Sequence, residues 1–387
     1  MKSQFVLGFT GGGTAGHVLP HVAIATHPES PVCQLLSSGE LKVVYFGSRD
    51  GVERSIVQKS QPDWVYIPIR TGKLRRYFSW QNFIDPFNIV IGFLKAVFEM
   101  RRQKIGCLFS KGGFVSAPVV WAAWLNRVPI VIHESDATPA LATRLTLPFA
   151  RKALVSFAET ICHFSESQRK KVMALGLPLR SELFGADKVS AHQFFGTDPQ
   201  RPTLLVFGGS LGAEGLNRKV AAALPLLKDR WNVIHIVGRG KKIEGDFGPC
   251  YRQYEFLLDE MKFAYAVADL AVCRAGASSI FELAAARIPM LLVPLGLHQS
   301  RGDQIINANI FVKKGWAESC DENTLSPQRL TESIEHMMSQ RSVIINKLAQ
   351  APDSKTAVVV GELLVSVLKN EHRLSEASDH LGDLSET

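Results

Sequence analysis

FVLGFTGGGTAGHVLP, at Phe5–Pro20, decides the fold together with its counterpart TLLVFGGSLGAEGLN, at Thr203–Asn217. In each stretch an apolar run typical of a β-strand ends in glycines and leads into a segment typical of a helix. Such a turn gathers backbone N–H groups at the positive end of a helix dipole, which suits a phosphate group. One turn in each half of the chain indicates two nucleotide-binding domains with ligands held between them.

Size and charge agree with this interpretation. The chain has 387 residues, more than one hydrophobic core usually supports, so two domains are expected. Lys and Arg number 44 against 36 Asp and Glu, and the net charge of +8 favours an anionic partner such as a nucleotide, an acidic lipid surface or nucleic acid. The six cysteines are scattered without the C-x-x-C spacing of a zinc or redox site. The first apolar run is too short for a signal peptide, and no apolar run reaches the roughly 18 residues of a membrane span.

Strand-like runs alternate with helical ones throughout, which predicts an α/β fold with parallel sheets. Several runs are apolar without alternation, as in strands that are buried on both faces. The predicted strands are 5–10, 42–48, 64–69, 107–110, 130–135 and 153–157 in the first half, and 203–208, 232–238, 254–257, 270–274 and 290–295 in the second. The predicted domains are 1–164 and 184–369, with a linker over 165–183 and a loosely ordered polar tail over 370–387.

The first turn has the GxGxxG spacing of a dinucleotide-binding fingerprint at 11–16. An NAD site also needs an acidic residue at the end of the second strand, whereas that strand ends in Gly47-Ser48. The first turn instead continues into His17, and a neutral imidazole there could take a proton from an attacking hydroxyl. The alternative is a capping or core histidine, and the residues alone leave both open.

The second turn, Gly208–Gly212, is the sharper candidate for a phosphate site. Ser210 adds a hydroxyl to the backbone N–H donors where the next helix begins. The alternative is a purely structural strand-to-helix turn. No GxxxxGK[ST] motif occurs, which disfavours a P-loop NTPase.

A third strand-to-helix passage, CRAGASSIFELAAARIP at Cys273–Pro289, also suits a nucleotide. Ser278 and Ser279 could cap its helix. Glu282, one turn into the helix, could accept two hydrogen bonds from ribose hydroxyls, unless it is a solvated or capping glutamate. The loop at 294–309 has donors and acceptors that suit a sugar: His298, Gln299, Arg301, Asp303, Gln304 and Asn307.

The stretch 70–104 has eight basic residues, opposed only by Asp85 and Glu99, with apolar side chains between the cations. This pattern is typical of a surface that dips into an anionic bilayer. The alternative is that much of 87–100 is a helix facing the core. No nucleic-acid partner is expected.

Several motifs, in order between Gly11 and Asn309, resemble those of the lipid-linked peptidoglycan N-acetylglucosaminyltransferases. They are GGTAGHVLP, SKGGFVSAP at 110–118, IHESDATPALA at 132–142, GLPLR at 176–180, GGSLGA, and the CRAGASSIFELAAARIP segment. The resemblance implies the GT-B fold, in which two Rossmann-like, doubly wound α/β domains face a central cleft. It also implies inverting transfer of N-acetylglucosamine from UDP-N-acetylglucosamine to undecaprenyl-diphospho-muramoylpentapeptide, at the cytoplasmic face of the bacterial inner membrane.

The resemblance assigns roles to individual residues. For the general base His17 is the first choice, with Glu134 and Asp136 as rivals. Residues expected to bind the donor are Thr14, Ala15, Gly16, Asp136, Arg180, Ser210, Leu257, Ala277, Ser278, Ser279, Ile280, Phe281, Glu282, Asp303 and Gln304. Residues expected to bind the acceptor are Gly12, Gly13, Thr14, Gly112 and Gly113. Neither a metal ion nor a cofactor is expected.

Three positions depart from the family pattern. Ala15 replaces a common glycine, and it still permits close approach of the backbone if its φ is negative. Ser135 and Asp136 stand where the family usually has Gln and Asn, and Leu177 stands where the hinge motif usually has Asn. The last two put particular contacts in doubt but not the fold.

Other functions stay open at this point. The same fold would serve a glycolipid synthase or a UDP-N-acetylglucosamine 2-epimerase. The GxGxxG spacing leaves a nicotinamide-dependent oxidoreductase as a weaker alternative, and the net charge leaves a non-catalytic basic binder of membranes or nucleic acid.

Overall fold

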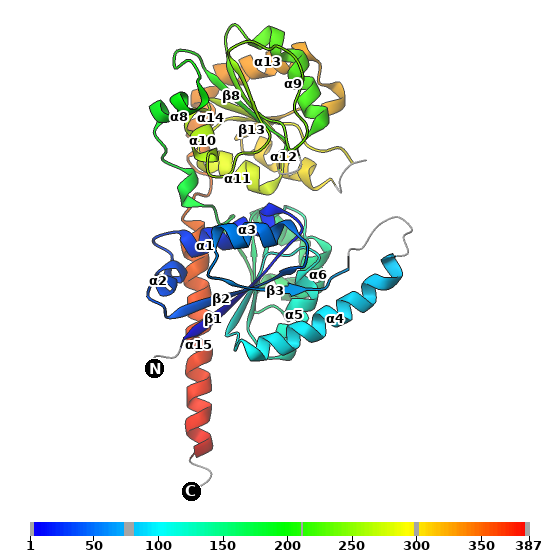
Figure 1. Ribbon diagram of the computed structural model, residues 1–387, viewed down its shortest axis with the longest axis vertical. Helices are drawn as coiled ribbons and strands as arrows, with labels where there is room; N and C mark the ends of the chain where they lie inside the picture. The colour runs from blue at the N-terminus through cyan, green and yellow to red at the C-terminus, as the bar shows by residue number, and fades with distance from the viewer. Residues whose placement is uncertain (1–3, 73–80, 210–211, 298–301, 384–387) are drawn as a thin grey trace. The chain divides into compact units, whose positions relative to one another are not determined.

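The computed structural model describes residues 4–72, 81–209, 212–297 and 302–383. It consists of two compact units. Unit 1 comprises residues 1–180 and 354–387, and unit 2 comprises residues 181–353. Each unit is a parallel sheet with helices on both faces, as the sequence predicts (Figure 1).

The sheet of unit 1 has seven parallel strands in the order β3-β2-β1-β4-β5-β6-β7. In register, Phe5 lies opposite Leu41 on one side of β1, and Leu7 lies opposite Cys107 on the other. The strands are β1 (Phe5–Thr10), β2 (Leu41–Ser48), β3 (Val65–Ile69), β4 (Cys107–Ser110), β5 (Ile130–Glu134), β6 (Lys152–Val155) and β7 (Val172–Ala174). The helices are η1 (Ala15–His17), α1 (Leu19–Thr26), α2 (Pro31–Ser37), α3 (Val52–Ser60), α4 (Gln81–Arg102), α5 (Ser116–Leu125), α6 (Leu141–Thr146), η2 (Leu147–Phe149), η3 (Ala158–His163), α7 (Glu166–Arg169) and α15 (Thr356–Asp383).

The sheet of unit 2 has six parallel strands in the equivalent order β10-β9-β8-β11-β12-β13. The strands are β8 (Thr203–Phe207), β9 (Asn232–Ile236), β10 (Tyr251–Tyr254), β11 (Leu270–Cys273), β12 (Met290–Leu292) and β13 (Ala317–Ser319). The helices are η4 (Ser181–Leu183), α8 (Lys188–Phe195), α9 (Glu214–Leu227), α10 (Met261–Val267), α11 (Ala277–Ala285), α12 (Asp303–Lys313), η5 (Glu322–Thr324), α13 (Pro327–Ser339) and α14 (Arg341–Leu348). The predicted strand at 254–257 is displaced, since β10 ends at Tyr254, and β7 and β13 were not predicted.

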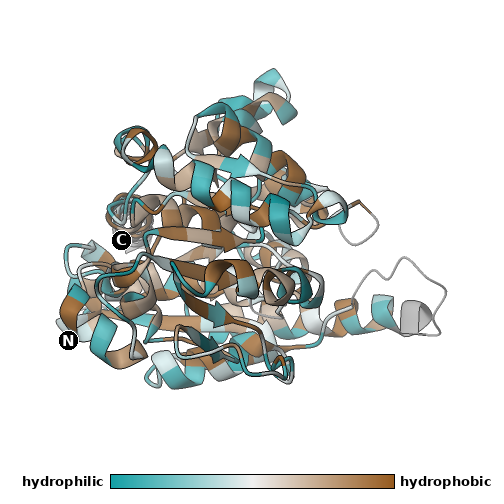
Figure 2. Ribbon diagram, turned by 90° about the horizontal axis from the view of Figure 1, so that it is seen from above, coloured by the Kyte–Doolittle hydropathy of each residue, from teal (hydrophilic) through white to brown (hydrophobic). Residues whose placement is uncertain are grey.

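Both faces of the unit 1 sheet are buried, which explains why its strands show little alternation. On β2, Val43 and Tyr45 face one core while Val44 and Phe46 face the other. The first core lies under α1, α2 and α15, and the second lies under α4 and α5. In Figure 2 the strands are mostly brown, while the helices carry both brown and teal. Side chains that alternate along a strand therefore enter two apolar layers.

The final helix corrects the predicted domain boundaries. α15 lies beside α1 and α2 (Figure 1), and its residues Ala357, Val360, Leu364 and Leu368 are buried in the first core of unit 1. Thr356 also donates its hydroxyl hydrogen to the carbonyl of Leu175 at 3.0 Å. Residues 354–369 thus belong to unit 1 and not to the second domain. Two other boundaries differ: residues 370–383 continue the helix, and unit 1 extends through most of the predicted linker to residue 180.

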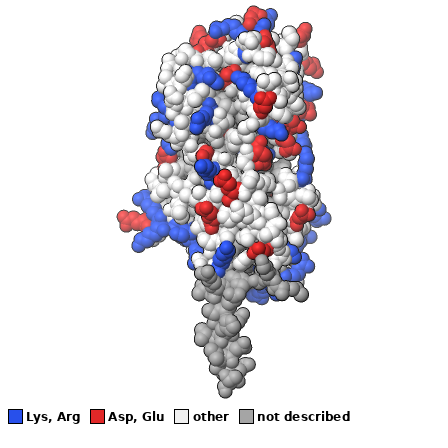
Figure 3. Space-filling model, turned by 90° about the vertical axis from the view of Figure 1, so that its left-hand side faces the viewer, with Lys and Arg blue, Asp and Glu red and all other residues white. Residues whose placement is uncertain are grey.

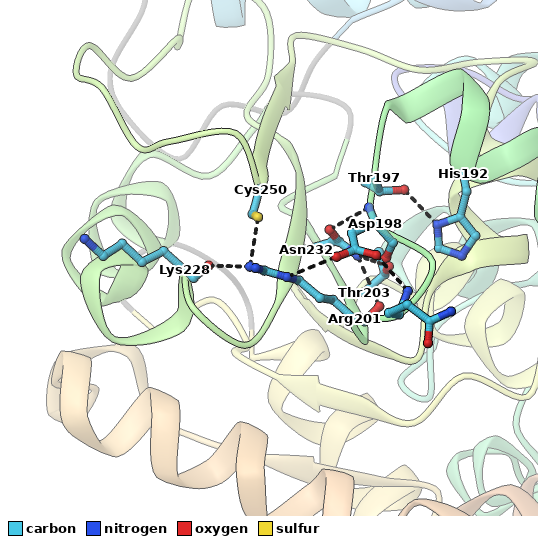
Figure 4. A network of polar contacts seen from close by, with 9 residues as sticks. His192, Thr197, Asp198, Arg201, Thr203, Lys228, Asn232 and Cys250 are labelled. Atoms are coloured by element: carbon cyan, nitrogen blue, oxygen red, sulfur yellow. Dashed lines mark hydrogen bonds and ion pairs between the residues drawn. The ribbon is translucent and has the colours of Figure 1, made fainter.

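A polar network fixes the start of β8 in unit 2 (Figure 4). The side chain of Asn232 accepts a hydrogen bond from the backbone N–H of Asp198 at 3.1 Å and donates to the carbonyls of Asp198 and Arg201 at 2.8 and 3.1 Å. His192, on α8, contacts the hydroxyl of Thr197 at 2.8 Å. The segment between α8 and β8 is therefore held to β9, and β8 leads from it directly to the second glycine turn.

Candidate active site

The sheet order of unit 1 places the first glycine turn at a switch point. β1 and β4 are neighbours, and the chain runs outward from them in opposite directions, which makes the loops that follow them the usual place for a ligand in an open α/β sheet. Gly12 and Gly13 follow β1, and Gly112 and Gly113 follow β4. A Cβ atom on Gly113 would lie 2.3 Å from the carbonyl oxygen of Gly12. The sheet thus brings together the glycines predicted for the acceptor.

His17 lies at the end of η1, directly after this turn. Its Nδ1 is 3.1 Å from the hydroxyl of Thr14, and its side chain is partly exposed. Burial, followed by the charge of Lys111, lowers the pKa of His17 to about 4, while the Gly12 carbonyl and Glu53 act in the opposite direction. The imidazole is therefore neutral at pH 7. Ala15 is not among the described residues with positive φ, which meets the condition for its replacing a glycine.

Glu53, on α3, is a residue that sequence reasoning missed. Its side chain is fully buried, and one carboxylate oxygen accepts hydrogen bonds from the backbone N–H and the hydroxyl of Ser48 at 2.9 and 2.5 Å. The other oxygen accepts from the backbone N–H of Gly13 at 3.2 Å. Ser48 ends β2, the position from which an acidic residue would bind the ribose in an NAD site. The carboxylate of Glu53 lies near this position, but it is hydrogen-bonded to the protein itself. The Gly13 N–H is therefore already hydrogen-bonded to a carboxylate of the protein.

Lys111 is the second missed residue, and it lies between β4 and Gly112. Its side chain is only 2% exposed, and its Nζ contacts Nδ1 of His133 and the hydroxyl of Ser135, at 2.5 and 2.7 Å. Burial lowers the pKa of Lys111 to about 7, against the attraction of Glu134 and Asp136. A lysine after an apolar strand was the available signal, because lysine is rarely buried without a role.

Glu134 is placed differently from what a general base requires. One carboxylate oxygen accepts from the backbone N–H groups of Ser135 and Asp136 at 2.9 and 3.2 Å. The other accepts from the N–H of Ala140 at 2.9 Å and the hydroxyl of Thr143 at 2.5 Å. With its side chain buried and four donors on it, Glu134 organises the loop after β5. Asp136 lies in that loop and is partly exposed.

Unit 2 repeats the switch point with β8 and β11. The second glycine turn follows β8, and its residues Gly209 and Gly212 have positive φ, +98° and +70°. A Cβ atom on Gly208 would lie 2.2 Å from that of Ala213, and one on Gly212 would lie 2.5 Å from the carbonyl oxygen of Val237. Ser210 lies outside the described residues. The turn packs against small side chains and backbone just before α9.

The passage after β11 forms the other side of this switch point. α11 begins at Ala277 after an N-cap at Gly276 without a side-chain cap, so the predicted capping by Ser278 and Ser279 is wrong. Ile280 and Phe281 are buried, so only their backbone can face a ligand. Glu282 is partly exposed and accepts a hydrogen bond from the hydroxyl of Tyr265 at 2.7 Å, a partner that the sequence did not predict.

The start of α12 is tied to the same loops. The Gln304 side chain accepts from the backbone N–H of Leu295 at 3.1 Å, and Asn307 donates to the carbonyl of Ala275 at 3.2 Å. Asp303 is the first residue of α12 and is partly exposed. Three other residues of the predicted sugar loop, His298, Gln299 and Arg301, lie outside the described residues. The first turns of α12 are therefore tied to the loops that follow β11 and β12.

Two other predicted donor residues come from different segments of the chain. Leu257 follows β10 and is buried. Arg180 is the last residue of the first segment of unit 1; it is 7% exposed, and its Nε has no hydrogen-bond partner within the described part of the chain. A buried guanidinium nitrogen without such a partner is suited to an anionic group.

Comparison with known proteins gives consistent results. The glycosyltransferase family 28 N-terminal domain matches residues 7–155, and the glycosyltransferase family 28 C-terminal domain matches residues 203–361. A UDP-N-acetylglucosamine–N-acetylmuramyl-(pentapeptide) pyrophosphoryl-undecaprenol N-acetylglucosamine transferase of Staphylococcus aureus strain RF122 is 40% identical over 90% of this chain and 95% of its own. A protein of the same name from Geobacillus thermodenitrificans is 42% identical over 88% and 92%.

Solved structures show the same fold at lower identity. The crystal structure of Acinetobacter baumannii MurG superposes with a TM-score of 0.70 and 23% identity, covering 94% of this chain and 99% of that one. A putative UDP-N-acetylglucosamine 2-epimerase from Listeria monocytogenes gives a TM-score of 0.64 at 10% identity, over 92% and 94%. Both units therefore have the Rossmann-like architecture of GT-B glycosyltransferases. The chain belongs to the glycosyltransferase family 28 enzymes that are named UDP-N-acetylglucosamine–N-acetylmuramyl-(pentapeptide) pyrophosphoryl-undecaprenol N-acetylglucosamine transferases.

Proposed function

We propose that this enzyme transfers N-acetylglucosamine from UDP-N-acetylglucosamine to undecaprenyl-diphospho-muramoylpentapeptide by a single displacement in which His17 accepts the proton. The acceptor hydroxyl attacks the anomeric carbon, the bond from that carbon to the UDP oxygen breaks, and the hydroxyl proton passes to the imidazole. The observation that carries this proposal is a neutral histidine, held by Thr14, at the switch point of unit 1.

The contact with Thr14 determines which nitrogen can act. In the proposed tautomer, Nδ1–H of His17 donates to the hydroxyl of Thr14, and Nε2 keeps its lone pair for the proton of the acceptor. A pKa of about 4 makes the free imidazole a weak base. An anionic diphosphate beside the turn would favour the imidazolium and move this pKa toward the working pH. Acceptor binding would thus strengthen the base.

Unit 2 would bind the donor. The first N–H groups of α9 and α11 have no acceptor within their helices and suit a diphosphate, with Ser210 adding its hydroxyl. Glu282 would accept hydrogen bonds from the ribose, and Asp303 and Gln304 would hold the sugar. Arg180 would stabilise the charge of the leaving UDP. These assignments follow the family motifs and the placement of the loops after β8 and β11.

The direct test is release of UDP from UDP-N-acetylglucosamine with and without a soluble lipid-linked muramoyl acceptor. We expect rapid UDP release that requires the acceptor. Epimerised sugar formed from the donor alone would instead indicate the epimerase, and turnover of His17→Ala at the wild-type rate would overturn the assignment of the base. Binding of UDP but not NADH, measured by fluorescence, is expected to exclude the oxidoreductase.

The acceptor carries a lipid, and α4 offers a surface that suits a bilayer. Its exposed face bears Phe87, Ile91, Leu94 and Phe98 at helical spacing, while its other face packs in the second core. Next to it lies an apolar cavity of about 330 Å³ that is lined by Ile89, Val90, Phe93, Trp121, Trp124, Leu125 and Phe149. The core-facing alternative is therefore met on one face of α4, and the opposite, exposed face is the surface that we propose for the membrane. Lys73, Arg75 and Arg76 lie outside the described residues.

Peripheral binding to an anionic membrane is the corresponding proposal. Arg101 and Arg102 are exposed at the end of α4. On the face of the molecule shown in Figure 3, basic and acidic residues are interspersed. No helix in the described part of the chain is long and apolar enough to span a membrane. We propose that the α4 surface lies against the cytoplasmic leaflet and presents unit 1 to the lipid-linked acceptor.

Vesicle sedimentation tests this surface. Leu94→Ser, at a residue 59% exposed, is expected to weaken binding to vesicles rich in phosphatidylglycerol several-fold. Leu226→Ser, on α9 of unit 2 and 50% exposed, is the matched control and is expected to leave binding unchanged. Equal loss in both variants, or none in Leu94→Ser, would contradict the proposed surface.

A further inference from the structure

Two buried charges of opposite sign adjoin the first glycine turn. A Cβ atom on Gly12 would lie 2.5 Å from a carboxylate oxygen of Glu53, and one on Gly11 would lie 3.2 Å from Cβ of Lys111. Both charged side chains are at most 2% exposed, although Gly13 and Thr14 in the same turn are exposed. Adjacent residues of the turn thus rest on a carboxylate and on a lysine.

Neither charge is neutralised by an ion pair. The partners of Glu53 are the Ser48 N–H and hydroxyl and the Gly13 N–H, and those of Lys111 are His133 and Ser135. Within the described ranges, no Lys, Arg, Asp or Glu lies within ion-pair distance of either. Burying one such charge is costly, and a direct Glu–Lys pair would reduce the cost. Two separate buried charges beside one turn therefore indicate that their electrostatic effect on neighbouring groups matters for function.

The charges act in opposite directions on His17. Lys111 disfavours the imidazolium and Glu53 favours it. His21 of α1 faces the same region, and burial keeps its pKa well below the usual value. His133 of β5 is also buried, with a lowered pKa, and Glu134 and Asp136 favour the charged form of Lys111. Among these surrounding groups, Lys111 has the largest effect on His17 after burial itself.

We propose that Glu53 and Lys111 are positioning residues of opposed charge, which hold the Gly11–Gly13 turn from beneath and act together on the proton acceptor His17. The proposal deepens the proposed function, since it rests on His17 as the base. Lys111 has its full effect below pH 7, where its amine is protonated, and this range includes the titration of His17. Glu53 limits the effect, so that the imidazole can still accept a proton.

Histidine NMR titration of the intact protein tests this directly. Lys111→Met keeps an apolar stem of similar length and removes the charge. We expect the pKa of His17 to rise by about one or more, a tenfold gain in proton affinity. Adding Glu53→Gln to Lys111→Met is expected to lower the pKa of His17 again. The acid limb of kcat against pH should move with the pKa of His17 in each variant.

Two controls and one fallback variant complete this experiment. Ser48→Ala removes a hydrogen bond from Glu53 but leaves its charge, so stability should fall while the pKa of His17 stays unchanged. His235 of unit 2, whose pKa burial lowers to about 3, should not respond to any of these changes. If Glu53→Gln does not fold, Lys111→Met and Lys111→Gln still test the larger of the two expected shifts in the pKa of His17.

An unchanged pKa of His17 in folded Lys111→Met, or shifts of the same sign on removing either charge, would overturn the proposal. Failure of the proposed function looks different. If His17→Ala retains turnover while the titrations behave as expected, the base is wrong but the role of the two charges stands.

Discussion

The two glycine turns occupy equivalent positions, after the first strand of equivalent sheets, yet they rest on different supports. The first packs on Glu53 and Lys111, and one of its N–H groups, that of Gly13, is already bonded to a carboxylate. The second packs on Ala213 and the backbone at Val237. Similar sequence patterns thus give different electrostatics. In the proposed function, the second turn binds the donor diphosphate, whereas the first positions the proton acceptor.

The largest expected effect separates these tasks. His17→Ala should lower kcat by about 10²- to 10⁴-fold with little change in KM for the donor, because general-base catalysis is lost. Ser210→Ala should mainly raise KM for UDP-N-acetylglucosamine. Steady-state kinetics with saturating acceptor measure both. If kcat and the KM for the donor change in the same way in both variants, the two turns do not have separate roles in catalysis and donor binding.

Two glycine-to-alanine substitutions compare how tightly the backbone is packed in the two units. Gly113 and Gly209 both have positive φ, but a Cβ on Gly113 meets the carbonyl oxygen of Gly12 while one on Gly209 meets nothing within 4 Å. Gly209→Ala should cost about 1–2 kcal/mol of unfolding free energy from its backbone conformation alone. Gly113→Ala should cost about 1–3 kcal/mol more from overpacking. Urea unfolding measures the difference, and equal costs would contradict the tight contact of the two loops.

Acid should destabilise unit 1 more than unit 2. Unit 1 contains His17, His21 and His133 with lowered pKa values, and unit 2 contains His192 and His235. In the unfolded chain these histidines take up protons near pH 6.5, whereas in the folded protein they stay neutral to lower pH. The free energy of unfolding therefore falls as the pH drops below 6.5, by up to about 1.4 kcal/mol per pH unit for each such histidine. Hydrogen exchange, corrected for its intrinsic pH dependence, should show earlier opening of β1, β4 and β5. Earlier opening of β8 and β11 would contradict this.

The smallest effect concerns the donor side. Tyr265→Phe removes the hydrogen bond to Glu282, and a bond to a charged acceptor contributes about 1.5–3 kcal/mol at most. We expect KM for the donor to rise about tenfold and kcat to change little. Tyr251→Phe, which alters a contact with His235 elsewhere in unit 2, is the control. If the control raises KM equally, Glu282 owes its position to something other than Tyr265.

The sheet framework was predictable because buried parallel strands have apolar runs and end at glycine turns. The short strands β7 and β13 lack such runs, since Met173 and Glu318 are accessible to solvent. Glu53 and Lys111 were missed because a charged residue in one sequence is assumed to be exposed, whereas the fold buries both side chains, one on α3 and one directly after β4. Glu134 illustrates the same limit, since its four donors come from a loop whose path no spacing pattern specifies. Whether the other predicted site residues bind substrate stays a prediction.

The return of α15 to unit 1 has a consequence for biosynthesis. The chain completes unit 2 as one continuous segment, 181–353, before it makes the helix that closes the first core of unit 1. On the ribosome, the earlier unit must therefore wait with Leu7, Phe9 and Ile24 incompletely covered while the later unit is already able to fold. Unit 1 is thus begun first but completed last. A chaperone that binds nascent chains would find exposed apolar surface on unit 1, the unit whose synthesis began first.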